Sequence, residues 1–194
     1  MGEEEVWIGT VGDRKSVVDV ITLGFSSDPM TRWTLPNPAQ YLAVMPELVD
    51  AFGGKAFQHG SVYCVDDFSG AALWLQPGTE PDGDRLGALI ARHASASVQN
   101  DAAGVLEQME AYHPHEPHWY LPLIAVDPAY QGRGLGGALL KQALARCDAD
   151  GLPAYLESSN PRNIALYQRH GFEILGRIQV GSSPVVTPMF RKSR

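Results

Sequence analysis

The most constraining feature of this chain is an apolar run followed at once by a glycine-rich loop and an amphipathic helix. Residues Trp119–Val126 have the sequence WYLPLIAV, which is typical of a strand covered on both faces. The next apolar pattern, at Gly134–Cys147, repeats every four residues and predicts a helix. A short apolar segment at Ala154–Glu157 follows, so we expect a parallel strand–helix–strand unit here.

The rest of the chain is expected to add further helices and strands to this strand–helix–strand unit. A stretch rich in Pro and Trp, Ser26–Ala39, is expected to be a loop. The other expected helices lie at residues 13–23, 41–52, 84–112 and 160–170, and the other expected strands at residues 5–11, 61–66, 71–75, 172–180 and 185–191. This order predicts a mixed sheet of the α/β or α+β class.

Composition argues against several classes of function. The 194 residues are enough for one domain, 1–194, that buries about two-thirds of its unfolded surface. A net charge of −7 argues against a general nucleic-acid binder, which needs a basic face. Cys64 and Cys147 make no disulfide framework, and no apolar run approaches the length of about 18 residues that a membrane span needs. The acidic opening residues lack a signal-peptide pattern, so we expect a cytoplasmic protein with no membrane partner.

The loop between the predicted strand and helix has the chemistry of an anion site. Unpaired backbone N–H groups at a helix start point outward, beside the positive end of the helix dipole. Gly132, Gly134 and Gly137 lack side chains that would hold an anion away, so the loop predicts a phosphate or pyrophosphate cradle. The alternative is a flexible turn whose glycines serve only the backbone angles.

The same three glycines also satisfy the dinucleotide-binding pattern G-x-G-x-x-G, and Glu157 lies about 20 residues beyond it. Two features count against a dinucleotide fold. Five residues separate Val126 from Gly132, whereas the dinucleotide turn places its first glycine directly after the strand. The pattern also comes late, since one strand–helix–strand unit and two strands remain after the loop. A dinucleotide-dependent oxidoreductase is therefore the less favoured hypothesis.

Two motifs at this spacing resemble those of the GNAT acetyltransferases. Gln131-x-x-Gly134-x-Gly136 is similar to the family's Q/R-x-x-G-x-G/A motif, and Val-Asp-Pro precedes it as is usual there. An Asn at position 160, Tyr167 seven residues later and then Gly-Phe are similar to the family's second signature. The resemblance implies an α/β (α+β) fold with a mixed central sheet of about seven strands flanked by helices.

A narrower resemblance concerns the puromycin N-acetyltransferase branch, to which residues 116–119 (EPHW) and 156–163 (LESSNPRN) are similar. The resemblance implies transfer of acetyl from acetyl-CoA to the primary amine of a small molecule, by direct attack in a ternary complex. It also implies acceptor-side elements at about 1–115 and an acetyl-CoA-binding core at about 118–175. Puromycin itself is not implied, because acceptor loops vary on a shared fold.

The resemblance divides the expected acetyl-CoA site among three groups of residues. A strand end would pair by backbone with the pantetheine arm, the loop amides would hold the pyrophosphate, and two Asn side chains and a Tyr would lie on one helical face beside the pantetheine. The expected residues are Ile124, Ala125, Val126, Gln131, Gly132, Arg133, Gly134, Leu135, Gly136, Gly137, Asn160, Asn163 and Tyr167. Arg133 has an equal alternative as a solvated loop residue.

Tyr167, Glu116 and Glu157 are the expected catalytic residues. A phenol with a pKa near ~10 suits protonation of a departing thiolate, which makes Tyr167 the expected general acid; the alternative is a core tyrosine. Glu116 and Glu157 are the candidates for a base, directly or through water. Glu157 has an alternative as a structural carboxylate paired with Arg162 or Arg169.

Three histidines, His113, His115 and His118, precede the strand that begins at Trp119. Two intervening prolines break regular geometry, and no acidic or cysteine set completes a tetrahedron, so we expect no metal site. One of these histidines could relay a proton. The loop that carries Trp33 is the expected acceptor-binding segment, since loops on a rigid scaffold carry specificity.

One alternative on the same scaffold is a non-catalytic acyl-CoA sensor, which would have no need of an acid at Tyr167. The expected partner is a small-molecule amine acceptor, and a homodimer is an option.

Overall fold

The computed structural model describes residues 5–194, so most of the acidic opening on which the signal-peptide expectation rests lies outside the described residues. Seven strands form one sheet in the order β1-β2-β3-β4-β5-β7-β6. The strands are β1 Val6–Ile8, β2 Val62–Val65, β3 Gly70–Leu75, β4 Trp119–Val126, β5 Ala154–Ser158, β6 Glu173–Ile174 and β7 Thr187–Arg191. The α-helices are α1 Arg14–Gly24, α2 Pro29–Thr34, α3 Pro38–Gly53, α4 Gly83–His93, α5 Ala96–Tyr112, α6 Leu135–Ala149 and α7 Ile164–Arg169.

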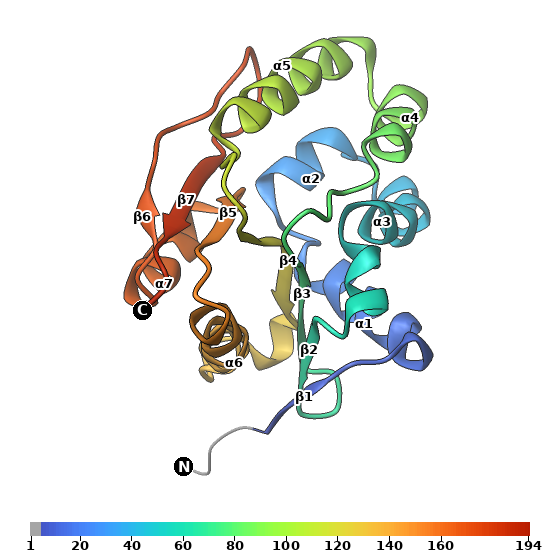
Figure 1. Ribbon diagram of the computed structural model, residues 1–194. Coiled ribbons are helices and arrows are strands. Elements are labelled where there is room, and N and C mark those ends of the chain that lie inside the picture. Colours follow the sequence, from blue (N-terminus) through green and yellow to red (C-terminus); the bar gives the residue numbers. More distant parts are fainter. Residues whose placement is uncertain (1–4) are drawn as a thin grey trace.

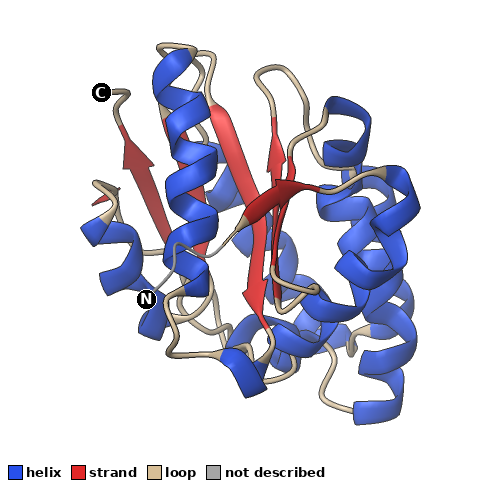
Figure 2. Ribbon diagram, turned by 90° about the horizontal axis from the view of Figure 1, so that it is seen from below, coloured by secondary structure: helices blue, strands red, loops and turns tan. Residues whose placement is uncertain are grey.

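The sheet is antiparallel except at its centre, where β4 and β5 run parallel and α6 connects them. Helices cover both faces of the sheet, with α1 and α3 on one side and α6 on the other (Figures 1 and 2). The expected α/β (α+β) fold, a mixed sheet of about seven strands flanked by helices, is confirmed.

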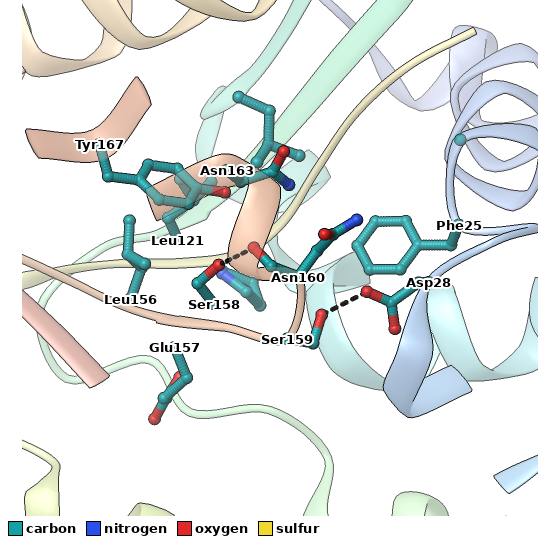
Figure 3. Close-up of a pocket in the computed structure, with 13 residues that line it drawn as sticks. Phe25, Asp28, Leu121, Leu156, Glu157, Ser158, Ser159, Asn160, Asn163 and Tyr167 are labelled. Carbon is teal, nitrogen blue, oxygen red and sulfur yellow. Dashed lines mark hydrogen bonds between the residues drawn. The ribbon is translucent and has the colours of Figure 1, made fainter. Parts of the chain in front are cut away.

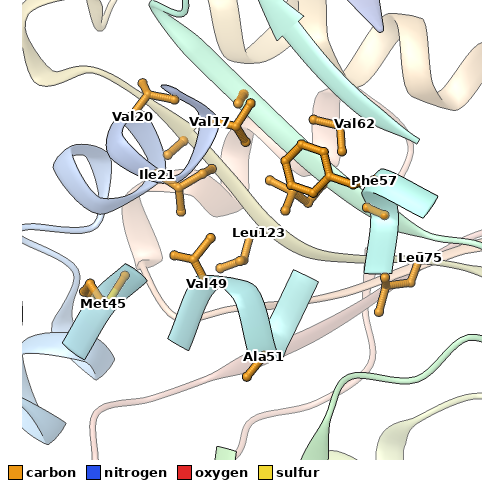
Figure 4. Close-up of a cluster of buried hydrophobic side chains, with 14 of the residues drawn as sticks. Val17, Val20, Ile21, Met45, Val49, Ala51, Phe57, Val62, Leu75 and Leu123 are labelled. Atoms are coloured by element: carbon orange, nitrogen blue, oxygen red, sulfur yellow. The ribbon is translucent and has the colours of Figure 1, made fainter. Parts of the chain in front are cut away.

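Two apolar clusters hold the helices to the sheet. On the α1 face, Val17, Val20 and Ile21 recur at helical spacing and pack against Val49 and Leu123 (Figure 4). On the opposite face, one stripe of α6 packs against buried residues of β3, β4, β5 and β7. The repeat of apolar residues every three or four positions therefore decides which side of each helix meets the sheet.

The expectation of a loop over Ser26–Ala39 is wrong, because α2 lies inside it and α3 begins at Pro38. The Asp28 carboxylate accepts a hydrogen bond from Thr31 N (2.9 Å), and Pro29 occupies the first helical position. An acceptor before a helix and a proline at its start are both strong helix-start signals. Two turns of helix therefore form where proline and tryptophan content indicated a loop.

Three other expected elements differ from the structure in their bounds. The helical region at residues 84–112 is two helices, because Ala94 is extended and the Ser95 hydroxyl caps α5 by accepting from Val98 N. The strand expected at residues 172–180 pairs only at Glu173–Ile174 and at an isolated bridge from Ile178. The helix expected at residues 160–170 is a 3-10 turn at residues 161–163 followed by α7.

Within residues 5–194, no helix combines the length and the apolar character needed to cross a bilayer.

Candidate active site

The two central parallel strands part shortly after they begin. The last β4–β5 pair joins Tyr120 to Tyr155, whereas β4 continues to Val126 and β5 to Ser158. Beyond that pair the two strands leave an opening between them. A pocket fills this opening on the side nearest α7, and we call it the gap pocket. It is lined by Gly24, Phe25, Asp28, Leu121, Pro122, Ile124, Leu156, Glu157, Ser158, Ser159, Asn160, Asn163 and Tyr167.

A β-bulge in β4 contributes to this opening. The register between β3 and β4 shifts between Leu73 and Leu75, opposite the part of β4 that contains Pro122. Proline has no N–H to donate, and a bulge bends the strand that carries it. Residues 124–126, the expected pantetheine contact, pair with β3 along one edge and lie beyond the last β5 pair along the other. The edge of residues 124–126 that has no strand partner therefore faces the gap pocket, and Ile124 lines that pocket.

Tyr167, Asn160 and Asn163 all line the gap pocket (Figure 3). Asn160 precedes the 3-10 turn rather than sharing a helical face with Tyr167, and its side-chain oxygen accepts from Arg162 N (3.1 Å). Tyr167 is 4% exposed, and burial, with a smaller contribution from the charge of Asp28, raises the pKa of its phenol. The phenol therefore stays protonated at neutral pH.

The predicted anion cradle has the backbone that it needs. Gly132 and Gly134 have φ of 79° and 94°, and a Cβ built on either would meet no atom within 4 Å. The helical hydrogen bond at the start of α6 runs from Ala138 N to Gly134 O, so the amides of residues 135–137 come before that ladder. These amides and the open space in front of them suit an anion at the positive end of α6.

The other loop residues have structural partners. Gln131 Nε2 donates to the carbonyl of Val126 (3.1 Å), which fixes the loop to the strand end. The Arg133 guanidinium lies 4.9 Å from the Tyr130 ring centre and donates to the carbonyl of Ala129 (3.4 Å), and the residue is exposed. The Leu135 side chain is buried in the α6 core, so only its backbone faces the loop. The structure thus places Arg133 at the rim of the cradle.

A second pocket lies on the opposite side of β5, and we call it the apolar cavity. Its volume is about 160 Å³, it is partly open to solvent, and α2, α3, α4 and α5 form most of its walls. It is lined by Phe25, Met30, Thr31, Trp33, Thr34, Met45, Leu48, Phe52, Leu86, Ile90, Ala102, Val105, Leu106, Met109, Leu123, Glu157, Ser159 and Val186. Phe25, Glu157 and Ser159 also line the gap pocket, so the two pockets meet at these three residues. Trp33 lines this cavity, and it belongs to the segment that we expected to bind the acceptor.

Glu157 points away from Tyr167, on the other side of β5 (Figure 3). Its side chain is 3% exposed, and Oε1 lies 3.8 Å from His113 Nδ1. The structure therefore gives Glu157 a histidine as its charged neighbour rather than Arg162 or Arg169. Burial alone would lower the pKa of His113, but the hydrogen bond and charge of Glu157, with smaller contributions from Glu80 and Glu110, raise it above its ordinary value.

Hydrogen-bond chemistry fixes the protons behind Glu157. The Glu116 carbonyl can only accept, so His118 donates to it from Nδ1 (2.8 Å). Burial, together with the charge of His113, lowers the pKa of His118, and the neutral ring then offers Nε2 as an acceptor. His113 Nε2 lies 3.0 Å from that atom and donates to it. The remaining His113 nitrogen, Nδ1, is the one that faces Glu157, so a proton on it is shared with the carboxylate.

The structure does not bring Glu116 to either pocket. Glu116 is exposed, and only its backbone carbonyl takes part in the histidine chain. His115 is also exposed. Within the described residues, no group of three His, Cys, Asp or Glu side chains is arranged to hold a metal ion.

Asp28 is a pocket residue that the sequence analysis missed. Its carboxylate is 5% exposed, caps α2 and accepts from Ser159 Oγ (2.5 Å), as Figure 3 shows. Burial raises the pKa of Asp28, against the opposing effect of these hydrogen bonds. The bond to Ser159 joins α2, a wall of the apolar cavity, to the end of β5. The Asp-Pro pair was the available signal, because it marks a helix start.

A family comparison agrees with this arrangement. The model of the acetyltransferase (GNAT) family matches residues 44–172, which is most of the chain and includes both pocket-forming strands and the glycine loop. The chain belongs to this family. Family membership, together with relatives named as acetyltransferases, supports an N-acetyltransferase of the GNAT type. The narrower resemblance to the puromycin branch stays a prediction.

Individual relatives include two curated acetyltransferases that match in sequence and one solved structure that matches in fold. This GNAT chain is 28% identical over 174 residues to an uncharacterized N-acetyltransferase of Schizosaccharomyces pombe, covering 82% of this chain and 70% of the relative. It is 34% identical over 163 residues to a mycothiol acetyltransferase of Acidothermus cellulolyticus, covering 76% of this chain but about half (49%) of that relative. A solved Corynebacterium glutamicum structure, described as histone acetyltransferase HPA2 and related acetyltransferase, is 27% identical with a TM-score of 0.73 over 100% of this chain and 98% of that one.

Proposed function

We propose that this chain acetylates the primary amine of a small molecule, using acetyl-CoA by direct attack within a ternary complex. One observation carries the proposal: the gap pocket and the apolar cavity approach from opposite sides of β5 and share Glu157. The gap pocket adjoins β4, whose far end leads into the amide cradle of α6. The cavity offers a buried carboxylate, which suits an ammonium group. Two reactants could therefore meet at the opening between the strands.

The cradle fits a pyrophosphate on steric and electrostatic grounds. The positive φ values at Gly132 and Gly134 turn the loop without placing a side chain in front of the α6 amides. The free edge of β4 would offer backbone groups to the amides of a pantetheine arm. When bound, acetyl-CoA would supply an acetyl thioester. In this proposal, the residues expected from the sequence to contact acetyl-CoA keep those contacts, with two changes. Leu135 would contribute only its backbone, and Arg133 would lie at the edge of the pyrophosphate site.

In this proposal, Tyr167 acts as the acid and Glu157 as the base, from opposite sides of β5. An amine that arrives as an ammonium ion must lose a proton before it can attack, and Glu157 is placed to accept it. The nitrogen would then form a bond to the acetyl carbon, the carbon–sulfur bond would break, and Tyr167 would give its phenolic proton to the sulfur. The bonded nitrogen would release its second proton, through water, to the Tyr167 phenolate, and the proton held by Glu157 would pass to solvent, so that both side chains return to their starting states. Burial raises the pKa of Tyr167, which keeps that proton in place until a thiolate develops. The same buried site also makes the thiolate a stronger base.

Binding and turnover test the proposal together. Thermal unfolding with acetyl-CoA at ~100 times its Kd should show about 2.7 kcal/mol of added stability, and NAD should give none. Turnover is followed as free thiol released from acetyl-CoA across a panel of primary amines.

The two rival functions give different results in the same experiment. Stabilisation by NAD and not by acetyl-CoA would support the dinucleotide-dependent oxidoreductase. Tight acetyl-CoA binding without thiol release for any amine would support the non-catalytic sensor. Thiol release that depends on an amine is expected only of the acetyltransferase.

A further inference from the structure

The apolar cavity has a chemical character that narrows the acceptor, provided that the function proposed above holds. Most of its walls are aliphatic, aromatic or thioether side chains, with Met30 and Trp33 from α2, Phe52 from α3 and Met109 from α5. Such a surface gains free energy by excluding water from an apolar group. The same surface offers few hydrogen bonds to a ligand with many polar atoms. The wall composition therefore favours an acceptor whose body is apolar.

The polar atoms of the walls are already engaged as donors. Thr31 Oγ1 donates to the carbonyl of Phe25 (3.0 Å), and Thr34 Oγ1 donates to the carbonyl of Met30 (3.0 Å). Trp33 Nε1 donates to the hydroxyl of Ser182 (3.2 Å). A sugar or other polyhydroxylated ligand would lose its hydrogen bonds to water here without equivalent replacements. The cavity is thus poorly suited to amino sugars.

Charge in the cavity is limited to a single group. Glu157 is the one charged side chain among the described residues that line it, and it lies where the cavity meets the gap pocket. When His113 is neutral, this one carboxylate can balance one ammonium ion, and it would hold that ion next to the opening between β4 and β5. A second ammonium group on the same ligand would be buried among apolar walls without a partner, which is costly. A polyamine therefore fits less well than a monoamine.

The size of the apolar cavity limits the apolar part of the acceptor. The cavity volume is about 160 Å³. For comparison, an engineered apolar cavity of about 150 Å³ in another protein binds benzene. One phenyl ring, or a branched alkyl group of that bulk, therefore fits between the helices while the amine stays at Glu157.

We propose that the acceptor is a primary monoamine that carries one apolar group of about the size of a benzene ring, with its ammonium at Glu157 and its apolar group between α2 and α5. Phenethylamine and isopentylamine represent this class. Putrescine, spermidine and glucosamine represent the classes that the cavity disfavours.

The first test compares these amines at saturating acetyl-CoA by kcat/KM. Phenethylamine should exceed putrescine and glucosamine by at least about 100-fold, since buried apolar contacts and unpaired polar groups both discriminate by such factors. Equal or better use of putrescine or glucosamine would overturn the proposal while leaving the acetyltransferase function intact. Preference for hexanoyl-CoA over acetyl-CoA, with no preference among amines, would assign the cavity to an acyl chain instead.

A pair of variants on α5 links the preference to the cavity. Ala102 is buried in the cavity wall, whereas its neighbour Ala103 is exposed and outside the lining. Ala102→Leu should raise KM for phenethylamine at least about 10-fold relative to KM for ethylamine. Ala103→Leu should leave that ratio unchanged. A ratio that is unchanged in Ala102→Leu, in a variant that still unfolds cooperatively, would contradict the assignment.

Direct binding keeps the proposal testable even if no turnover is seen. Calorimetry should show phenethylamine binding to the unmodified chain, with weaker binding to Ala102→Leu and to Glu157→Gln. Binding with this pattern but no thiol release would remove the proposed function and keep the monoamine site. Absence of both binding and turnover would overturn the monoamine site as well.

Discussion

At the scale of single residues, strand alternation explains why the acid and the base candidates lie on opposite sides of β5. Successive residues of a strand point to opposite faces, so Leu156 and Ser158 face the same side as Tyr167, and Glu157 faces the apolar cavity (Figure 3). His113 then stands behind Glu157, with its Nδ1 toward the carboxylate. A shift of one residue in β5 would exchange these faces and leave the cavity without its carboxylate.

The base candidate is tested by replacing the carboxylate with its amide. Glu157→Gln keeps the shape of the side chain and removes the proton acceptor, so kcat should fall by a factor on the order of 10²–10⁴ near neutral pH. Glu116→Gln is the matched control, because Glu116 is exposed and outside both pockets, and its kcat should stay unchanged. A large loss in Glu116→Gln and none in Glu157→Gln would reverse the assignment.

The acid candidate is tested by removing one hydroxyl. Tyr167→Phe keeps the ring that packs against Phe172, so the fold should survive. If the phenol protonates the departing thiolate, kcat should fall by a factor on the order of 10²–10⁴, while the acetyl-CoA Kd from calorimetry changes little. A water molecule in place of the hydroxyl would reduce the loss, most visibly at low pH, where a proton is easier to supply. An unchanged kcat would make Tyr167 a packing residue.

At the scale of elements, the start of α6 is where sequence and structure agree most directly. A buried strand, a short loop and a helix are all coded by patterns within a few residues of one another, so local reasoning was enough to place Gly132 and Gly134. Their positive φ is a property that glycine adopts at little cost and other residues at a cost of about 1–2 kcal/mol.

A negative charge added at the start of α6 should weaken the binding of an anion there. Gly134→Asp places a carboxylate in the cradle, so the acetyl-CoA Kd should rise by at least about 100-fold through repulsion of the pyrophosphate. Gly78→Asp is a close control, since Gly78 also has a positive φ (77°) and open space around it but lies outside both pockets. Both variants should lose similar stability in urea. Normal acetyl-CoA affinity in a folded Gly134→Asp protein would remove this loop from the site.

Several contacts of the site and of its surroundings depend on partners distant in the chain, and these the sequence could not supply. Asp28 caps α2 and also accepts from Ser159, an interaction that no local pattern contains. The segment after Leu175 leaves regular pairing beside Tyr112 of α5, whose hydroxyl occupies the space that a side chain at Gly176 would need. The pairing of Glu157 with His113 was likewise invisible, because it joins β5 to the end of α5 through the fold and not through sequence spacing. The clustered histidines indicated that one of them could relay a proton, but they did not indicate that Glu157 is the group beside His113.

At the scale of the whole molecule, β7 lies between β5 and β6 and supports the part of the sheet that carries the site. β7 pairs with β5 along its whole length and so supports the strand that presents Glu157. Arg191 of β7 is 4% exposed, and its two terminal nitrogens each donate to one oxygen of Asp148 in α6 at 2.8 Å. Its Nε donates to the carbonyl of His170 (2.9 Å), so one side chain joins β7, α6 and the end of α7.

Removal of the Asp148 charge should therefore weaken the entire fold and not only one helix. Asp148→Asn leaves the buried Arg191 guanidinium without its anion, and we expect a loss of about 3 kcal/mol in the free energy of unfolding at pH 7. Hydrogen bonds from Arg191, with smaller contributions from Arg194, lower the pKa of Asp148 below its unfolded value of 3.8. A group with a lowered folded pKa contributes its stability above the unfolded pKa and loses it as pH falls through the folded pKa.

The difference between the wild type and Asp148→Asn should thus be constant from pH 7 to about pH 5 and shrink at lower pH, as measured by urea unfolding at each pH. Asp19→Asn serves as the control, because the Asp19–Lys15 pair is exposed and spaced i,i+4, and its loss should cost no more than about 0.5 kcal/mol. A difference for Asp148→Asn that stays the same at pH 3 as at pH 7 would show that its cost comes from altered packing and not from the lost charge. A difference no larger than that of Asp19→Asn would show that the β7–α6 connection does not stabilise the fold.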